Sequence, residues 1–376
     1  MLPMKFSCEK AILQTAVTTA GRVVSPKSTI QALEGVLMEA ENGYLRISGY
    51  NLETGIITQV EADVQESGAI VLSARLLGEI LRRMPDDAVS VNADADCSVH
   101  VQCGPTSFDI KGYSDEDFPE LPSVDEGASL ILPQGSLKSM IAQTIFAVSD
   151  NESRPIHTGA LFETETDTLT MVAVDGYRLA LRREKLAEQS AAGNISFVVP
   201  GAALNEVEKI CADSDDTVTV TQGDRHVMFQ IGATLLVSRR LEGEFLNYRQ
   251  TIPTNNAVVL EAECADLQRS IDRASLIINE KLKSPLRCKF EDGSLSITSK
   301  TAIGSAFDRC PITGDGGGLE IGFNNRFLMD AVKAAPASRV RLELNTSTSP
   351  CLILPSKGET DNFLYMVLPV RLRAGE

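Results

Sequence analysis

Two copies of one heptapeptide decide the fold of this chain, and they read Gly35-Val36-Leu37-Met38-Glu39-Ala40-Glu41 and Gly159-Ala160-Leu161-Phe162-Glu163-Thr164-Glu165. They share a glycine, a leucine and two glutamates at an offset of 124 residues, and Leu45 and Ile47 likewise correspond to Leu169 and Met171. A third copy places Leu295 and Ile297 250 residues beyond Leu45 and Ile47. Apolar and polar residues alternate in these stretches, as half-buried strands require. Asn42-Gly43 and Asp292-Gly293 predict the turns of two hairpins.

Helices are predicted at the same period. A first helix is expected at about 8–22, 135–148 and 264–279, and a second at about 74–84, 202–213 and 326–335. Ser73 and Asn324 suit the helix starts, Pro85 and Pro336 follow the ends, and Leu76, Leu77, Ile80 and Leu81 lie on one apolar stripe. Each third of the chain is therefore predicted to be an α+β module with two helices packed on an antiparallel sheet.

Links rich in proline separate the three modules. They lie at 118–127 and 248–256. We therefore expect modules at residues 1–125, 126–253 and 254–376.

Composition excludes several classes of protein. The chain has 376 residues, 43% of them hydrophobic, and no apolar run approaches the roughly 18 residues that span a bilayer. The eight cysteines are scattered without a Cys-x-x-Cys pair, and the three histidines are far apart. We therefore expect free thiols, a cytoplasmic protein, and no metal or cofactor.

Charge and motifs give little sign of chemistry. The formal net charge is −16, which by itself argues against strong binding of nucleic acid. No phosphate-binding loop, nucleophile elbow or zinc-binding helix motif occurs. The glycine-rich stretch at 314–318 precedes a predicted strand and no helix, so we expect it to be a hairpin connection.

The stretch Asp175-Gly176-Tyr177-Arg178 admits three interpretations. It is a tight turn between strands, a recognition corner that faces a partner, or half of an acid–base pair with His157. The turn is favoured, because catalysis would lack both a nucleophile and a metal.

Basic residues gather on the predicted helices and many acidic residues on strands and loops. This pattern fits an anionic protein that holds DNA against a basic helix face, or simply a set of solvated helix faces. The sequence leaves both interpretations open.

Taken over its whole length, the chain resembles the bacterial sliding clamp, the β subunit of the replicative DNA polymerase III. The likeness rests on the three-fold repeat and on four stretches: 4–6 (MKF), 153–159 (SRPIHTG), 174–180 (VDGYRLA) and 365–372 (YMVLPVRL). The resemblance implies three tandem clamp modules that close, as a head-to-tail homodimer, into a ring of six.

The same resemblance implies a function without catalysis. The ring would encircle and slide along duplex DNA as a processivity factor. A groove between the second and third modules would bind short peptides from the polymerase alpha subunit, the clamp loader, repair polymerases, and ligase or mismatch-repair proteins. An enzyme that uses the corner, and a specialised second clamp with a different partner, are the competing hypotheses.

The resemblance also assigns residues to three sites. The groove residues are His157, Thr158, Gly159, Val174, Gly176, Tyr177, Arg178, Leu179, Leu246, Met366, Leu368, Pro369, Val370 and Arg371, of which Arg178 and Arg371 would orient the peptide. The DNA-facing residues are Arg22, Lys27, Arg75, Lys138 and Asn151. The dimer-interface residues are Phe108 and Ile110 on an edge strand of module one, which would meet Leu276 and Ile277 of module three. Two positions depart from the family pattern: His157 replaces a commonly apolar residue, and 200–203 lacks basic residues.

Overall fold

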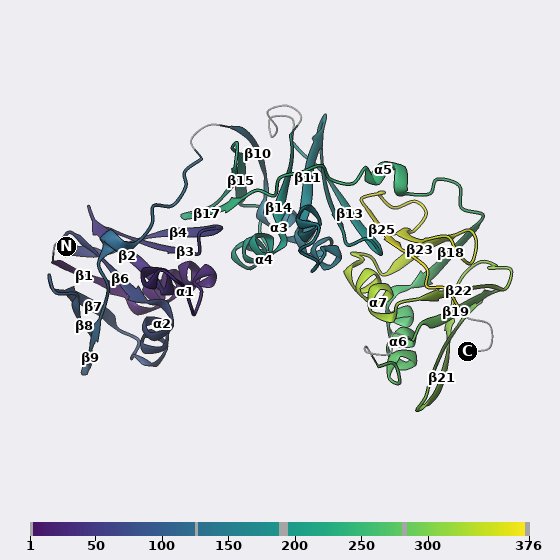
Figure 1. Ribbon diagram of the computed structural model, residues 1–376, viewed down its shortest axis with the longest axis horizontal. Coiled ribbons are helices and arrows are strands. Elements are labelled where there is room, and N and C mark those ends of the chain that lie inside the picture. The colour runs from purple at the N-terminus through teal and green to yellow at the C-terminus, as the bar shows by residue number, and fades with distance from the viewer. Residues whose placement is uncertain (1–2, 125–126, 188–194, 280–283, 373–376) are drawn as a thin grey trace. The chain divides into compact units, whose positions relative to one another are not determined.

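The computed structural model describes residues 3–124, 127–187, 195–279 and 284–372 (Figure 1). These residues form four antiparallel sheets in two compact units. The first unit contains the described residues up to Lys138 together with 202–240, and the second contains the others.

The first unit holds a five-stranded and an eight-stranded sheet. The strand order of the five-stranded sheet is β5 (Asp63–Glu66), β1 (Met4–Glu9), β7 (Ala88–Ala93), β8 (Ser98–Cys103) and β9 (Thr106–Lys111). The order of the eight-stranded sheet is β10 (Ala128–Pro133), β15 (Thr217–Gln222), β16 (His226–Ile231), β17 (Thr234–Arg239), β4 (Thr54–Glu61), β3 (Tyr44–Tyr50), β2 (Gly35–Glu41) and β6 (Gly68–Ser73). In the larger sheet, β17 of the second repeat pairs with β4 of the first.

The second unit repeats this plan. Its eight-stranded sheet has the order β14 (Ser196–Pro200), β11 (Gly159–Glu165), β12 (Thr168–Val174), β13 (Arg178–Lys185), β25 (Phe363–Val367), β24 (Cys351–Pro355), β23 (Arg339–Leu344) and β18 (Val258–Glu263). Its four-stranded sheet has the order β21 (Gly304–Pro311), β20 (Ser294–Thr301), β19 (Leu286–Glu291) and β22 (Leu319–Phe323). Here β25 of the third repeat pairs with β13 of the second.

The six predicted helices are present, and the first helix of each pair ends earlier than expected. The α-helices are α1 (Lys10–Ala20), α2 (Ala74–Arg83), α3 (Gln134–Ala142), α4 (Gly201–Ile210), the one-turn α5 (Tyr248–Thr251), α6 (Cys264–Ser275) and α7 (Asn325–Ala334). The 3₁₀ turn η1 (Gly21–Val23) follows α1, and η4 (Ile145–Ala147) comes soon after α3. A 3₁₀ turn is a common way for an α-helix to end, and it accounts for part of the difference at α1 and α3. No 3₁₀ turn follows α6 in the described residues.

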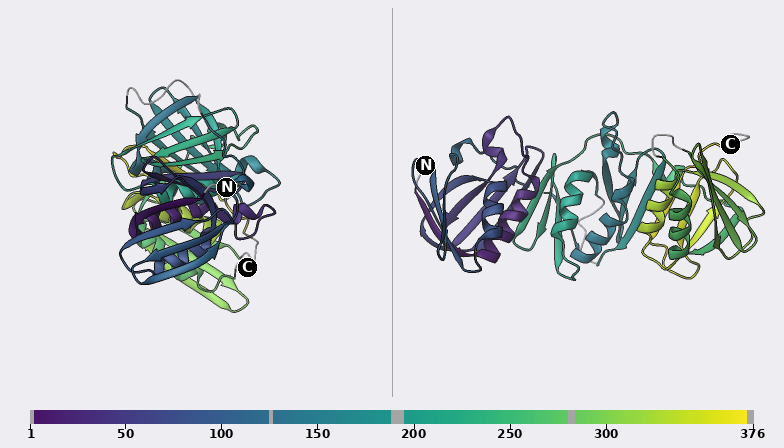
Figure 2. Two further views of the ribbon diagram at one scale, coloured as in Figure 1. Left: turned by 90° about the vertical axis from the view of Figure 1, so that its left-hand side faces the viewer. Right: turned by 90° about the horizontal axis from the view of Figure 1, so that it is seen from below.

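The two helices of the first module, α1 and α2, pack side by side, and so do the two helices of the third module, α6 and α7 (Figures 1 and 2). The predicted caps are confirmed: the Ser73 hydroxyl accepts the Leu76 N–H, and the Asn324 side chain accepts the N–H groups of Arg326 and Phe327. None of the helices in the described ranges is long and apolar enough to cross a membrane.

The apolar stripe of α2 is narrower than predicted. Leu77, Ile80 and Leu81 are buried in the core of the first unit, and each stabilises the fold by roughly 1.5–3 kcal/mol. Leu76 instead lies 43% exposed, so it does not belong to the core.

The turn predictions have mixed outcomes. Asn42 and Gly43 both have positive φ (51° and 81°), as the predicted hairpin turn requires, whereas at the second site Gly293 (φ 66°) but not Asp292 does. The hairpin predicted at 314–318 is wrong. This stretch connects β21 with β22, which lie at opposite edges of the four-stranded sheet and do not pair.

Candidate functional site

A tight turn at residues 175–178, here called the corner, joins β12 to β13. One carboxylate oxygen of Asp175 accepts the backbone N–H groups of Tyr177 (2.9 Å) and Arg178 (3.0 Å). Gly176 has φ of 92°, a conformation that side chains disfavour. The predicted turn is thus confirmed, and its side chains project from the end of two strands.

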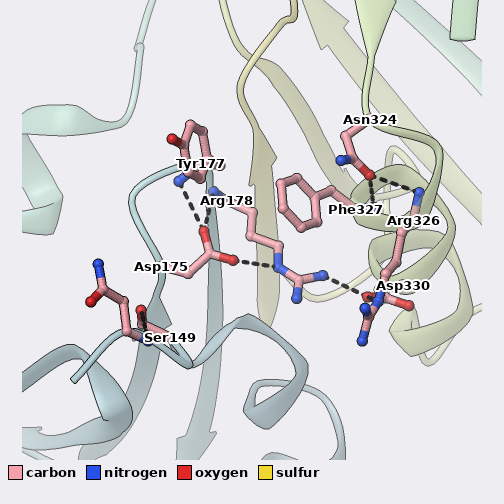
Figure 3. Close-up of polar contacts among 9 residues, drawn as sticks. Ser149, Asp175, Tyr177, Arg178, Asn324, Arg326, Phe327 and Asp330 are labelled. Atoms are coloured by element: carbon pink, nitrogen blue, oxygen red, sulfur yellow. Dashed lines mark hydrogen bonds and ion pairs between the residues drawn. The ribbon is translucent and has the colours of Figure 1, made fainter. Parts of the chain in front are cut away.

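The Arg178 side chain lies beneath the corner and joins it to α7 (Figure 3). Arg178 is only 8% exposed. Its Nε donates to Asp175 at 2.9 Å, and its Nη1 donates to Asp330 at 2.6 Å. The guanidinium carbon lies 4.5 Å from the centroid of the Phe327 ring. A buried guanidinium needs such paired carboxylates, because desolvating an unpaired charge is costly. Two of its donor nitrogens, Nε and Nη1, bind protein carboxylates, so Arg178 holds the corner against α7. Its role in orienting a peptide stays a prediction.

Tyr177 is the exposed part of the corner. Tyr177 is 64% exposed, and its ring stacks on the Phe327 ring with centroids 6.1 Å apart. Its carbonyl accepts the N–H of Leu368 at 2.9 Å. The corner therefore contacts two segments of the third repeat, α7 and the stretch that follows β25.

An apolar bed lies beside the corner in the second unit. Leu179 and Met366 are buried in one cluster, and Ile156, Phe245 and Leu368 pack against it while partly exposed. Apolar floors with a few polar groups are typical of peptide-binding sites. All fourteen predicted groove residues belong to this unit, and we call them the candidate peptide-binding surface.

The C-terminal end of this surface is a short segment at 368–372. Leu368, Pro369 and Val370 are half-buried, and Arg371 is exposed. The Val370 N–H donates to the Gly322 carbonyl of β22 at 2.7 Å.

The link between the second and third repeats supplies Leu246, which is 37% exposed. The Tyr248 N–H donates to the Leu246 carbonyl at 2.7 Å, and the buried Tyr248 hydroxyl donates to Glu163 at 2.8 Å. Burial and the Glu163 carboxylate raise the pKa of Tyr248 far above its ordinary value. Arg249 also lies 2.9 Å from Glu163, so this glutamate fastens the link to β11.

His157 does not form an acid–base pair with Asp175. Its ring meets the Phe245 ring edge to face, with centroids 5.9 Å apart, and burial together with Arg154 lowers its pKa, although Asp175 opposes the shift. Both Asp175 oxygens already accept bonds from residues 177 and 178, and no His157–Asp175 hydrogen bond occurs in the described part of the chain. The same described residues contain no cluster that could hold a metal ion.

The predicted DNA-facing residues differ in how free their charges are. Arg22 lies 3.7 Å from Glu206, and Lys138 lies 2.8 Å from Asp213. Lys27 and Arg75 are exposed, and neither has an ion pair within the described ranges. The exposed Asn151 belongs to the second unit, and its side-chain oxygen accepts the Ser153 N–H at 3.0 Å.

The predicted interface residues lie at exposed places of their units. Phe108 is 38% exposed and Ile110 half-buried on β9, which is an edge strand as predicted. Leu276 is 79% exposed just after α6, and Ile277 is half-buried.

Some residues that shape these places were missing from the predictions. Asp330, Phe327 and Phe245 are distant in sequence from the corner, and no local pattern links them to it. Ile303, 81% exposed, immediately precedes β21, and Phe307, 63% exposed, lies on this edge strand. The sequence contained a signal for Phe307, because extending the 250-residue offset places it on a strand equivalent to β4.

Comparison with known proteins gives a consistent result. The models of the N-terminal, central and C-terminal domains of the DNA polymerase III beta subunit match residues 4–122, 131–247 and 249–371. The Beta sliding clamp of Synechocystis sp. is 31% identical over 401 residues, which cover 98% of this chain and 100% of that protein. The structure of the Bacillus subtilis DNA polymerase sliding clamp is 28% identical with a TM-score of 0.92, and that of the Thermotoga maritima DNA polymerase III beta subunit is 26% identical with a TM-score of 0.90. Each covers 98% of this chain and 100% of its own.

The three matches follow one another along the chain, as the three-fold repeat predicts. The fold is therefore three tandem clamp modules of α+β type. The protein is a non-catalytic processivity subunit of DNA polymerase III. The chain belongs to the DNA polymerase III beta-subunit family, the bacterial sliding clamps.

Proposed function

We propose that two copies of this chain close head to tail into a ring that encircles duplex DNA and tethers partner proteins through the candidate peptide-binding surface. The observation that carries this proposal is a strand pairing that joins neighbouring modules, here called a joint. This joint occurs twice within the chain, and the strands for a third such joint are present but are not paired with each other. At the first joint β17 pairs antiparallel with β4, from Ser238↔Thr54 to Thr234↔Thr58. At the second, β25 pairs with β13 in the same way, from Val367↔Arg178 to Phe363↔Arg182.

The two strands that would form a third joint are present, and within the described residues each of them pairs with a neighbour on one side alone. By the 250-residue offset β21 corresponds to β4, and β9 takes the place of β17 after an equivalent hairpin; both are edge strands. Phe108 on β9 and Phe307 on β21 are exposed. Exposed apolar edges favour strand pairing, so β9 of one copy pairs with β21 of the other.

The repeat also predicts the register of this pairing. Gly304 takes the place of Thr54 and Ile110 that of Ser238, which sets Ile110 opposite Gly304 and Phe108 opposite Ala306. At the first joint the hydrogen bonds from Arg239 to Glu53 and from Gln59 to Ala233 leave the intervening Leu236–Ile56 pair non-hydrogen-bonded. The equivalent Phe108–Ala306 pair therefore has its side chains close together.

Two measurements test the ring. Light scattering should give about 81 kDa, twice the chain mass of 40.5 kDa. Under mild oxidation, Phe108→Cys with Ala306→Cys should form an intermolecular disulfide. Ser107→Cys with Ala306→Cys is the control, because a one-residue shift turns the side chain to the other face. A stable monomer, or equal cross-linking by both pairs, would contradict the proposal.

Weak attraction to phosphate suits a ring that slides. Arg22, Lys27, Arg75, Lys138 and Asn151 are the proposed DNA-facing residues. Arg22 and Lys138 already have carboxylate partners, which leaves Lys27 and Arg75 as the freer cations. Each phosphate contact steepens the fall of log K, the DNA-binding constant, with log salt concentration by about 0.9. The double variant Lys27→Ala with Arg75→Ala should therefore make this dependence shallower by less than about 2.

The candidate peptide-binding surface would receive an extended, apolar peptide. The replicative polymerase, the clamp loader, and repair polymerases, ligase or mismatch-repair proteins are the proposed partners, in the cytoplasm, where the eight free cysteines would stay reduced. Alternate side chains of an extended peptide face one side, so fluorescein-labelled Leu-Ser-Leu-Ser-Phe is a suitable probe. Fluorescence anisotropy should show saturable binding, whereas an all-serine pentapeptide should not bind. Failure of the apolar peptide would count against this surface.

A further inference from the structure

We infer that Gly322, in the four-stranded sheet, is a positioning residue for the candidate peptide-binding surface. This inference rests on the peptide binding proposed above. Gly322 is not one of the predicted surface residues; it lies on β22 and acts through the segment 368–372, here called the tail.

The tail is held by backbone hydrogen bonds to two different segments. The Leu368 N–H donates to the Tyr177 carbonyl of the corner at 2.9 Å. Two residues later, the Val370 N–H donates to the Gly322 carbonyl at 2.7 Å, in an antiparallel bridge. Pro369, between them, has no N–H to donate. The tail therefore spans from the corner to the edge of β22.

Only a residue without a side chain permits this docking. A Cβ added at Gly322 would lie 2.6 Å from the Val370 carbonyl oxygen and 2.6 Å from Cδ2 of Leu372. The first of these is backbone, which cannot rotate away as a flexible side chain can. Gly322 is buried on β22, an edge strand of the four-stranded sheet. The side of β22 that faces away from the tail is paired with β19, so β22 itself has little room to move.

The tail supplies three half-buried residues of the surface, Leu368, Pro369 and Val370. A displaced tail would move these residues relative to the buried floor of Leu179 and Met366, while the floor keeps its own packing. Gly322 thus sets the distance between the floor and one wall of the surface without touching the peptide.

The test compares Gly322→Ala with Gly78→Ala in the full chain. Gly78 is a matched control, because a Cβ there meets no atom within 4 Å. Hydrogen exchange, followed by mass spectrometry on the tail peptide, reports the docking, since an amide that loses its hydrogen bond exchanges faster. Anisotropy with fluorescein-labelled Leu-Ser-Leu-Ser-Phe reports the surface.

We expect Gly322→Ala to speed exchange in the tail and weaken the peptide roughly tenfold, with a near-normal melting temperature. Adding Leu372→Ala removes one of the two clashes and should restore part of the affinity, which a general loss of folding would not do. Faster exchange with unchanged peptide affinity would overturn the inference and leave the proposed function standing. Failure of the wild-type protein to bind the peptide would overturn both.

Discussion

The corner of the second module has a counterpart in the first, at Asn51–Thr54, and the two share a backbone but not a chemistry. The Asn51 side chain accepts the N–H groups of Glu53 (3.0 Å) and Thr54 (2.7 Å), as Asp175 does two N–H groups in its own turn. The Glu53 carbonyl accepts the Arg239 N–H at 2.9 Å, which matches the bond from Leu368 to Tyr177. Each corner thus closes a joint between modules.

The side chains on this shared backbone are different. The exposed Tyr177 stands where the first corner has Glu53, and the buried Arg178 stands where it has Thr54. The second corner consequently reaches α7, whereas the first ends in a small buried hydroxyl. The comparison teaches that the repeat specifies the joint, and that a few substitutions on it give rise to the candidate peptide-binding surface.

The largest expected difference between the two corners is at their fourth position. Arg178→Ala leaves Asp175 and Asp330 without their shared cation, and should lower the free energy of unfolding by about 2–3 kcal/mol. Thr54→Ala should cost only about 1 kcal/mol. Denaturant titrations of both variants measure this, and equal losses would show that the ion pairs do not distinguish the corners.

The second position tests the backbone itself. Leu52 has φ of 75° and is 50% exposed, whereas Gly176 adopts φ of 92° without strain. Leu52→Gly should therefore gain about 1 kcal/mol and Gly176→Leu should lose about 1–2 kcal/mol, as read from thermal unfolding. If Leu52→Gly destabilised the protein, the leucine would be stabilising its corner through packing.

The repeated heptapeptide sharpens the comparison further. Glu39 makes an exposed ion pair with Arg46 at 3.7 Å, whereas the equivalent Glu163 binds Tyr248 and Arg249 of the link. We expect Glu163→Ala to cost about 2 kcal/mol and Glu39→Ala less than about 0.5 kcal/mol, in matched urea titrations. Similar costs would mean that Glu163 does not fasten the link.

The smallest expected effect depends on pH. The pKa of His157 is lowered from about 6.5, mainly by burial, so the folded state resists protonation and loses stability as pH falls below that value. If a bound apolar peptide covers His157 as proposed, it would bury the imidazole further, and affinity should drop roughly threefold between pH 7.5 and 5.5. His157→Leu should abolish this pH dependence. His226→Leu is the control, because burial also lowers the pKa of His226, which lies on β16; loss of the dependence in this variant would contradict the assignment.

The sequence was informative wherever the structure repeats and uninformative about contacts that occur once. The offset of 124 residues was enough to predict β2, β11 and the helix pairs, and Asp175-Gly176 was enough to predict its turn. The ion pair between Arg178 and Asp330 joins residues 152 positions apart and has no equivalent in the first module. The repeat in the sequence therefore could not predict it. The failed hairpin at 314–318 has a similar cause, because glycine-rich turn signals do not reveal which strand comes next to which in a sheet.

The pairing of edge strands also has a mechanical consequence. Two of the three kinds of joint, β17 with β4 and β25 with β13, are covalently continuous through the chain, so their strands re-form at once if they part. In the proposed ring, the β9–β21 seam alone joins separate molecules, and strands that part there can drift away. In such a ring the seam would be the place where DNA enters and leaves, and the strength of its pairing, rather than that of the internal joints, would set how long a closed ring stays on DNA.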